Sequence, residues 1–307
     1  MTTTLIEKTY LFLLKNLLRG KKNIILALDW KVIRERYNFL SISWVLDSGH
    51  SIPLFFSGYE KGTLGKGKSQ TTIESKSIET VIKTLGFKRN ITVLADRGFD
   101  SPAFLKHLEE LKVKYVIRIC SAQWIYFKNG KKAKIGKRII KKGDHKKYND
   151  IKYTGTAKHR CNLYIKWQEN QKVPWFLLSN INVKLEKICG LYSRRWSIDE
   201  MFKSLKNEDV GFNLRKVRLR HFDRWLSLLF VATIFFQAIG MLGFKLRQIK
   251  GIEKPYTMSS KPSEKQNFIF SIFNIAILII FDKLIRLRYS VLSGFQIRWP
   301  DSVWLRL

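Results

Sequence analysis

Short apolar runs follow one another from residue 23 to residue 119, each bounded by turn-forming or charged residues. NIILALDW (23–30), RYNFLSISWVL (36–46) and SIPLFFSG (51–58) predict three strands, the last two joined by a turn at 47–49. TIESKSIETVIKTLG (72–86) predicts a helix, ITVLAD (91–96) a strand, SPAFLKHLEELK (101–112) a helix that begins at Ser-Pro, and KYVIRI (114–119) a strand. The predicted order is therefore βββαβαβ.

This order predicts the fold class. Three antiparallel strands followed by alternating strands and helices form a ribonuclease H-like core, an α/β fold with a mixed sheet and helices on its faces. We expect five segments: a basic N-terminal helix (1–22), the first part of the core (23–120), a β-rich basic insertion (121–173), the second part of the core (174–245) and a helical C-terminal region (246–307).

The expected insertion contains the run KNGKKAKIGKRIIKKGDHKK, in which half of the positions are Lys or Arg. A charge block this dense also fits a disordered basic loop, so both interpretations stay open. After it, PWFLLSNI (174–181) predicts a strand that rejoins the core, and a long helix is expected from about 184 to 208.

Charge indicates the partner. Lys and Arg total 57 against 24 acidic residues, a formal net charge of +33, which favours a polyanion such as nucleic acid. Charge alone is equally compatible with a basic protein that binds without chemistry. Three widely spaced cysteines predict neither a disulfide framework nor a zinc knuckle, and they fit a reducing cytoplasm.

A membrane protein is a further alternative. Residues 225–244 contain no charge and reach the length of about 20 residues that spans a bilayer. Gln237 dilutes this run and basic residues flank it, so a buried core helix is the better interpretation. The run at 268–281 is too short to span, and the N-terminus predicts a basic amphipathic helix rather than a signal peptide.

Two acids follow apolar runs, Asp29 in IILALDW and Asp96 in VLADRGF. Acids at strand ends lie at the edge of a sheet, where metal or substrate can reach them. With a third acid from a helix they would form a set of oxygen ligands suited to Mg²⁺ or Mn²⁺. Two such ions about 4 Å apart can activate a nucleophile and stabilise a leaving oxygen at a phosphodiester.

The segment YSRRWSIDEMFKSLK (192–206) offers the third acid. On a continuous helix, five of its polar residues fall within an arc of about 80°, with Asp199 in the middle and Glu200 roughly 100° from the centre. We therefore expect Asp199 to be the functional acid and keep Glu200 as the fallback. The alternative is that Asp199 only forms an ordinary i, i+4 ion pair with Lys203 on the helix surface. The five residues are Tyr192, Arg195, Asp199, Lys203 and Lys206.

A rival motif is the run GTLGKGKS (62–69), which satisfies the P-loop pattern G-x-x-x-x-G-K-[ST] and would make the protein an NTPase with Lys68 at its phosphate site. A P-loop should follow an apolar strand directly, yet Tyr59, Glu60 and Lys61 separate the glycines from SIPLFFS. The sequence around 70–72 also predicts a helix start beyond Lys68. A basic flexible loop is the better interpretation.

Residues 23 to 245 resemble bacterial insertion-sequence transposases of the DDE type, in the branch whose signature is Tyr, two residues, Arg, three residues, Glu, six residues, Lys. That spacing falls on Tyr192, Arg195, Asp199 and Lys206, while Asp29 in LALDW and Asp96 in ADRGF match the first two acids. The loop LGKGKSQT and a β-rich insertion are also typical of this branch. Trp175 is similar to a tryptophan that can stack on a flipped base, although a core position is equally compatible.

The resemblance implies cut-and-paste transposition, with two Mg²⁺ or Mn²⁺ ions held by Asp29, Asp96 and Asp199. It also implies double-stranded DNA as the partner, phosphate contacts from the Tyr, Arg and Lys residues of the signature and from Lys203, a homodimer in the synaptic complex, and a cytoplasmic, nucleoid-associated protein. Two departures leave a catalytically inactive, truncated DNA-binding remnant open. Asp199 stands where the family has Glu, and only 28 residues precede Asp29.

Overall fold

The computed structural model describes residues 3–46, 50–65, 67–138, 141–154, 159–206, 213–214 and 216–247. The predicted turn at 47–49, the apolar run at 268–281 and all but the first two residues of the predicted C-terminal region lie outside this range. The chain divides into two compact units, Met1–Gln237 and Ala238–Leu307. In the second unit only the end of one helix is described.

One mixed sheet forms the core of the first unit. Its first five strands lie in the order β3-β2-β1-β4-β5, with β1 parallel to β4, β4 parallel to β5, and β2 antiparallel to both of its neighbours. This arrangement confirms the predicted α/β, ribonuclease H-like fold class. The strands are β1 Asn23–Ile33, β2 Tyr37–Val45, β3 Ser51–Glu60, β4 Asn90–Ala95 and β5 Lys114–Arg118.

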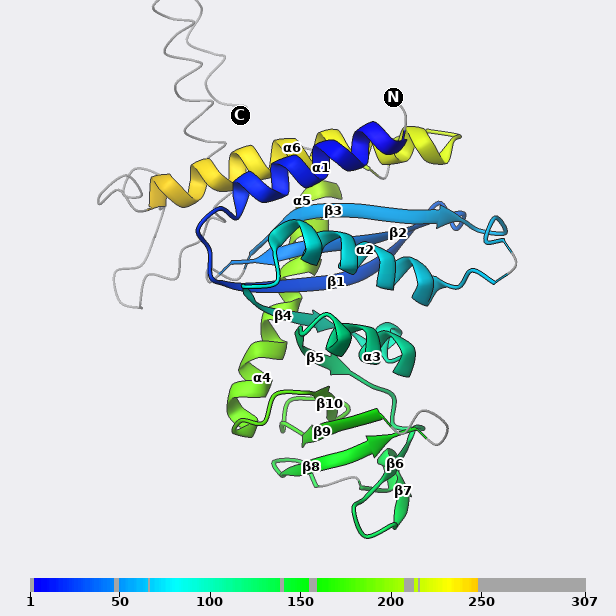
Figure 1. Ribbon diagram of the computed structural model, residues 1–307, viewed down its shortest axis with the longest axis vertical. Coiled ribbons are helices and arrows are strands. Elements are labelled where there is room, and N and C mark those ends of the chain that lie inside the picture. Colours follow the sequence, from blue (N-terminus) through cyan, green and yellow to red (C-terminus); the bar gives the residue numbers. More distant parts are fainter. Residues whose placement is uncertain are drawn as a thin grey trace, which may run out of the picture. The chain divides into compact units, whose positions relative to one another are not determined.

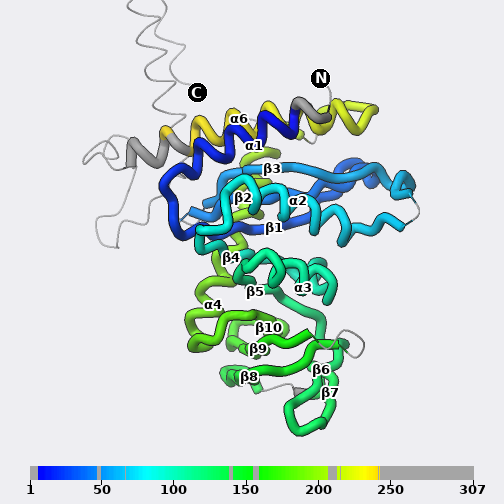
Figure 2. Tube along the Cα trace, in the orientation of Figure 1, coloured from blue at the N-terminus to red at the C-terminus, as the bar shows by residue number. Residues whose placement is uncertain are grey.

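The insertion does not form a sheet of its own. β10 pairs with β5, and the four strands of the insertion continue the same sheet in antiparallel fashion, in the order β10-β9-β8-β6-β7 (Figure 2). The residues described in this region are thus ordered into a sheet extension despite their charge. The elements are β6 Trp124–Tyr126, β7 Lys132–Lys134, the 3₁₀ turn η2 Ile135–Arg138, β8 His145–Tyr153, β9 His159–Lys166 and β10 Trp175–Ser179.

Helices cover both faces of the sheet. Figure 1 shows α2 (Gln70–Leu85) and α3 (Pro102–Glu110) on one face, and α4 (Leu185–Ser193) and α5 (Ser197–Lys206) on the other. Side chains of a strand alternate between faces, so Trp30 on β1 points to α2, whereas Asp29 and Lys31 point to α5. The first and third predicted acids therefore meet on the α5 side.

The prediction of one long helix over 184–208 is wrong. A 3₁₀ turn, η3 (Arg194–Trp196), separates α4 from α5. A 3₁₀ turn has three residues per turn instead of 3.6, so the helical arc calculated from Tyr192 does not carry through to α5. At this turn the Arg195 side chain is buried, whereas Trp196 is 55% exposed. The carbonyl oxygen of Ser197, just after it, accepts a hydrogen bond of 3.0 Å from the Ser51 hydroxyl of β3.

Two further helices are α1 (Thr3–Leu17) and α6 (Phe222–Arg247). Within the first unit, the part of α6 up to Gln237 packs beside α1 (Figure 1), and the rings of Tyr10 and Phe230 meet edge to face at 5.0 Å. Phe222–Gly240 is long and apolar enough to cross a membrane, but half of its most apolar window is buried. Trp225 is fully buried, and Gln237 donates to the carbonyl oxygen of Pro53 at 3.0 Å. Core helices of soluble proteins have this pattern, so α6 is not evidence for a membrane span.

Candidate active site

The parallel pairing of β1 with β4 brings the first two predicted acids to the same level of the sheet. Leu28 pairs with Ala95, the last residue of β4, so Asp29 and Asp96 are the next residues along the two adjacent strands. Asp96 then caps the 3₁₀ turn η1 (Arg97–Phe99), because its Oδ1 accepts from the amide of Gly98 at 2.9 Å. β1 itself continues to Ile33, so Asp29 lies within its strand rather than at the predicted strand end.

Four charged side chains form a chain of ion pairs on the α5 side. The Lys31 ammonium lies 2.7 Å from Oδ2 of Asp29 and 3.3 Å from Oδ1 of Asp199. The other oxygen of Asp199, Oδ2, accepts from Nη2 of Arg195 at 3.2 Å. The order is therefore Asp29, Lys31, Asp199, Arg195, with negative and positive charges alternating. This places the Lys31 ammonium between Asp29 and Asp199.

Burial sets the protonation behaviour of this chain. Asp29 is only 6% exposed, and burial raises the pKa of its carboxyl group, while the charge of Lys31 lowers it. For Lys31, burial disfavours the charged ammonium, but its contacts with Asp29 and Asp199 outweigh this and raise its pKa. Each charge is thus held in place by its neighbour.

The acids suit a hard divalent ion in kind. Three carboxylates supply the oxygen ligands that Mg²⁺ and Mn²⁺ take. Oδ2 of Asp29 is buried, and the Lys31 ammonium 2.7 Å away occupies the position that a cation would take at this oxygen. Within the described part of the chain, however, no three Asp, Glu, His or Cys side chains stand close enough to hold a metal as they are. Lys31 lies where Asp29 and Asp199 would otherwise share a cation.

Glu74 on α2 is an acid that the sequence prediction missed. It is 1% exposed, and its Oε1 accepts from Nε1 of Trp30 at 2.7 Å and from Nε2 of Gln70 at 3.1 Å. Burial raises the pKa of Glu74, and the nearby charge of Asp96 raises it further. The signal was available: Glu74 begins the buried stripe of α2, which continues with Ser77, Ile78, Val81, Ile82 and Leu85.

Tyr192 and Trp175 pack against each other, with Tyr192 buried and Trp175 partly exposed. Their rings meet edge to face at 5.1 Å, and Tyr192 is 2% exposed. Burial raises the pKa of the Tyr192 hydroxyl, Arg195 and Arg118 lower it, and the charge of Asp96 raises it. Trp175 packs against a buried cluster that includes Tyr192. Trp175 is itself partly exposed, at the margin of this cluster.

The remaining predicted residues divide into two groups. Glu200 pairs with Lys203 at 2.5 Å, and both side chains are more than half exposed, so the structure does not bring this pair to the acids. Lys206, at the end of α5, lines a cavity together with Lys31. The expected stripe is thus divided, with Arg195, Asp199 and Lys206 on the side of Lys31 and Lys203 turned away with Glu200.

At the loop 62–69, the expected separation between the strand and the glycines is not found. β3 extends through Tyr59 to Glu60, so the strand does reach the glycine-rich loop, and α2 begins at Gln70 directly after its N-cap Ser69. β3 is, however, an edge strand that pairs antiparallel with β2 alone. A P-loop follows a strand inside a parallel sheet, so the topology still argues against an NTPase.

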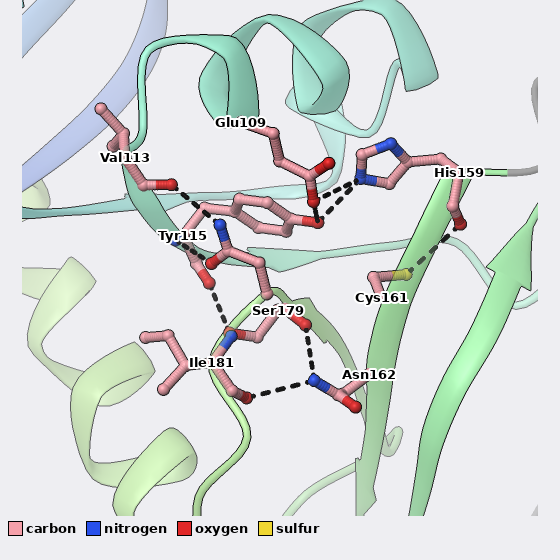
Figure 3. A network of polar contacts seen from close by, with 9 residues as sticks. Glu109, Val113, Tyr115, His159, Cys161, Asn162, Ser179 and Ile181 are labelled. Carbon is pink, nitrogen blue, oxygen red and sulfur yellow. Dashed lines mark hydrogen bonds and ion pairs between the residues drawn. The ribbon is translucent and has the colours of Figure 1, made fainter.

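A second polar network lies on the other side of β4, where the insertion joins the core (Figure 3). The hydroxyl of Tyr115 on β5 lies 2.9 Å from Nε2 of His159 on β9, and this nitrogen lies 3.3 Å from Oε1 of Glu109 on α3. The backbone amide of Tyr115 donates to Oδ1 of Asn180 at 3.0 Å, and Ser179 donates to its carbonyl oxygen at 2.6 Å. Burial lowers the pKa of His159 and raises that of Tyr115, so both are neutral near pH 7.

The mixed sheet and the helices on its two faces define a core of the ribonuclease H-like class. The family described as "Transposase DDE domain" matches residues 23–235, and the chain belongs to this family. Family membership confirms the resemblance to DDE transposases. No curated protein matches the chain.

Solved structures of nucleases share the fold only loosely. Endonuclease V of Ciona intestinalis, in complex with a DNA that contains inosine, is 14% identical with a TM-score of 0.34, covering 60% of this chain and 88% of that one. Human ENDOV is 10% identical with a TM-score of 0.34, covering 70% and 99%. The Marinitoga piezophila Argonaute with guide RNA is 14% identical with a TM-score of 0.28, covering 58% of this chain, which spans about a quarter (26%) of that one.

Proposed function

We propose that the protein is a metal-dependent DNA transposase that cleaves strands at transposon ends and transfers them to target DNA, by a cut-and-paste route. The observation that carries this proposal is the linkage of Asp29 and Asp199 through Lys31, with Asp96 one residue beyond the parallel strand next to β1, in a DDE-family core. Mg²⁺ or Mn²⁺ bound there would supply an activated water and stabilise the leaving oxygen of the phosphodiester. The net charge of +33 fits double-stranded DNA as the substrate.

Each residue has a role that its position supports. Asp29 and Asp96 would hold metal from adjacent strands, and Asp199 would complete the set from α5. Arg195 orients the carboxylate of Asp199 through their 3.2 Å contact. Lys206 lines the cavity beside the acids, a position from which it can bind a terminal phosphate. A homodimer in the synaptic complex and a cytoplasmic, nucleoid-associated location are part of the same proposal.

A specific observation favours the second candidate, a catalytically inactive DNA-binding remnant. Both oxygens of Asp199 are already engaged, one by Lys31 and one by Arg195. Aspartate is also one methylene shorter than the glutamate of the family, which can leave a ligand about 1 Å short of its metal. A remnant would keep the fold and the charge but would cleave nothing.

Strand nicking on the inverted repeats that flank the gene separates these two candidates. We expect Mg²⁺- or Mn²⁺-dependent nicking by the unmutated protein, and its loss in Asp29→Ala and in Asp96→Ala. The neighbouring pair Asp199→Asn and Glu200→Gln provides a matched control on one helix: the first variant should be inactive and the second active, because Glu200 points to Lys203. Absence of nicking by the unmutated protein would favour the remnant.

A further inference from the structure

Lys31 is the one residue of the acid cluster that neither the family resemblance nor the proposed reaction assigns. It lies two residues after Asp29 on β1, so its side chain leaves the same face of the sheet. Its ammonium lies 5.0 Å from the ring centroid of Phe202 on α5, and its contacts with Asp29 and Asp199 complete a fixed position. Three partners from two elements therefore hold it.

The charges around Lys31 leave no vacancy for a second cation. Asp29 and Asp199 contribute two negative charges, and Lys31 and Arg195 contribute two positive ones. A divalent ion shared by the two carboxylates would have to lie close to an ammonium within a partly buried site, where like charges repel strongly. Metal can enter between these acids only when the ammonium of Lys31 moves away.

A cavity beside Lys31 offers the ammonium another position. This cavity has a volume of about 260 Å³, and its polar lining contains three cations, Lys31, Arg34 and Lys206. Such a set favours an anion with several oxygens, as in a DNA phosphate. The apolar part of the lining comes from Val32, Ile33, Phe39, Phe56, Phe202, Leu214 and Leu229.

From this geometry we infer that Lys31 is a gating residue: without DNA its ammonium takes the cation position between Asp29 and Asp199, and a DNA phosphate in the adjacent cavity draws it out and admits metal. This inference rests on the proposed metal-dependent function. It makes metal binding and DNA binding mutually reinforcing, since a ligand that removes Lys31 from the acids raises their affinity for metal by the same factor as metal raises the affinity for that ligand.

Direct Mn²⁺ binding to the whole protein tests the gate without any measurement of activity. We expect Lys31→Met to bind Mn²⁺ at least about tenfold more tightly than the unmutated protein in the absence of DNA, as measured by electron paramagnetic resonance of free Mn²⁺. A short duplex should raise the Mn²⁺ affinity of the unmutated protein but not that of Lys31→Met. Lys83→Met, which removes an equally charged side chain paired with Glu79 on α2, is the matched control and should change nothing.

Further variants distinguish the possible failures. Lys31→Gln removes the charge but keeps a hydrogen-bond donor for Asp29, so it replaces Lys31→Met in the binding assay if that variant does not fold. Asp29→Asn in the Lys31→Met background should abolish the gain in Mn²⁺ affinity. Equal Mn²⁺ affinities of the unmutated and Lys31 variants would overturn the gate and leave the proposed function standing. Absence of Mn²⁺ binding in every variant, with and without DNA, would overturn both.

Discussion

The two polar networks on either side of β4 differ in how their groups are paired. Around Tyr115 and His159, most partners are hydroxyl, amide and backbone groups, Glu109 is the one carboxyl group of the network described, and the backbone of Tyr115 is bonded at both its amide and its carbonyl group. Around Asp29, acidic and basic side chains alternate in a partly buried chain of ion pairs. Networks of paired polar groups stabilise a fold, whereas clusters of buried charges are typical of functional sites. The first network fastens the insertion to the core, and the second is the candidate active site.

The largest expected effect is a loss of nicking activity on substitution of an acid in the candidate active site. Asp96→Asn keeps the oxygen that caps η1 but loses the carboxylate charge, so nicking should fall on the order of 10³-fold while the free energy of unfolding stays close to that of the unmutated protein. Nicking kinetics and chemical denaturation of the same samples check this. A variant that cleaves at the original rate would remove Asp96 from the site.

A smaller effect, in the opposite direction, is expected when the third acid, Asp199, is lengthened. Asp199→Glu restores the longer side chain of the family, so nicking should rise by about tenfold if the aspartate falls short of its metal. Initial rates at saturating Mn²⁺ give the comparison. Glu200→Asp, the reverse change on the neighbouring exposed residue, is the control and should leave the rate unchanged. A lower rate for Asp199→Glu would mean that the site is built for aspartate.

The second network should respond in stability instead of activity. Tyr115→Phe removes a hydroxyl that lies 2.9 Å from His159, and it should lower the free energy of unfolding by about 1 to 2 kcal/mol. Denaturation midpoints measure the loss, and Tyr126→Phe, at a partly exposed position of β6, is the control. Nicking per folded molecule should stay unchanged. A selective loss of nicking in Tyr115→Phe would contradict the division of roles.

The smallest effect concerns Glu74 and depends on pH. Burial raises the pKa of Glu74 in the folded protein, so its contribution to stability is fully present below the unfolded pKa of about 4.3 and is lost as pH rises through the folded value. Glu74→Gln keeps the acceptor for Trp30 without the charge. Its stability relative to the unmutated protein should therefore increase between pH 4 and the folded pKa and then level off, as followed by thermal denaturation across pH. A difference that does not vary with pH would contradict the burial of a carboxylate.

Local patterns predicted the first half of the fold because each element carries its own periodicity. The strands around Asp29 and Asp96 are short apolar runs, and α2 and α3 show helical spacing, so their order alone indicated the fold class that the structure confirms. The break at η3 was not predictable, since Arg-Arg-Trp has no residue that opposes a helix.

The candidate site was predictable only in part. Strand-end acids and family spacing identified Asp29, Asp96 and Asp199 as candidates, and their catalytic roles stay predictions. Lys31 could not be predicted as a site residue, because its contact with Asp199 joins residues 168 positions apart in the sequence and arises only in the tertiary fold. Glu74 could have been found as a charged residue on an apolar stripe.

The central claim is that three acids from separate elements bind one metal centre. Iron-mediated hydroxyl-radical cleavage tests it most directly: Fe²⁺, ascorbate and peroxide are added to the protein with a short duplex, and the cut positions in the polypeptide are mapped. The account predicts cuts near residues 29, 96 and 199 that excess Mg²⁺ suppresses and that disappear in Asp29→Asn. Cuts confined to other segments, or cuts that persist in Asp29→Asn, would contradict it.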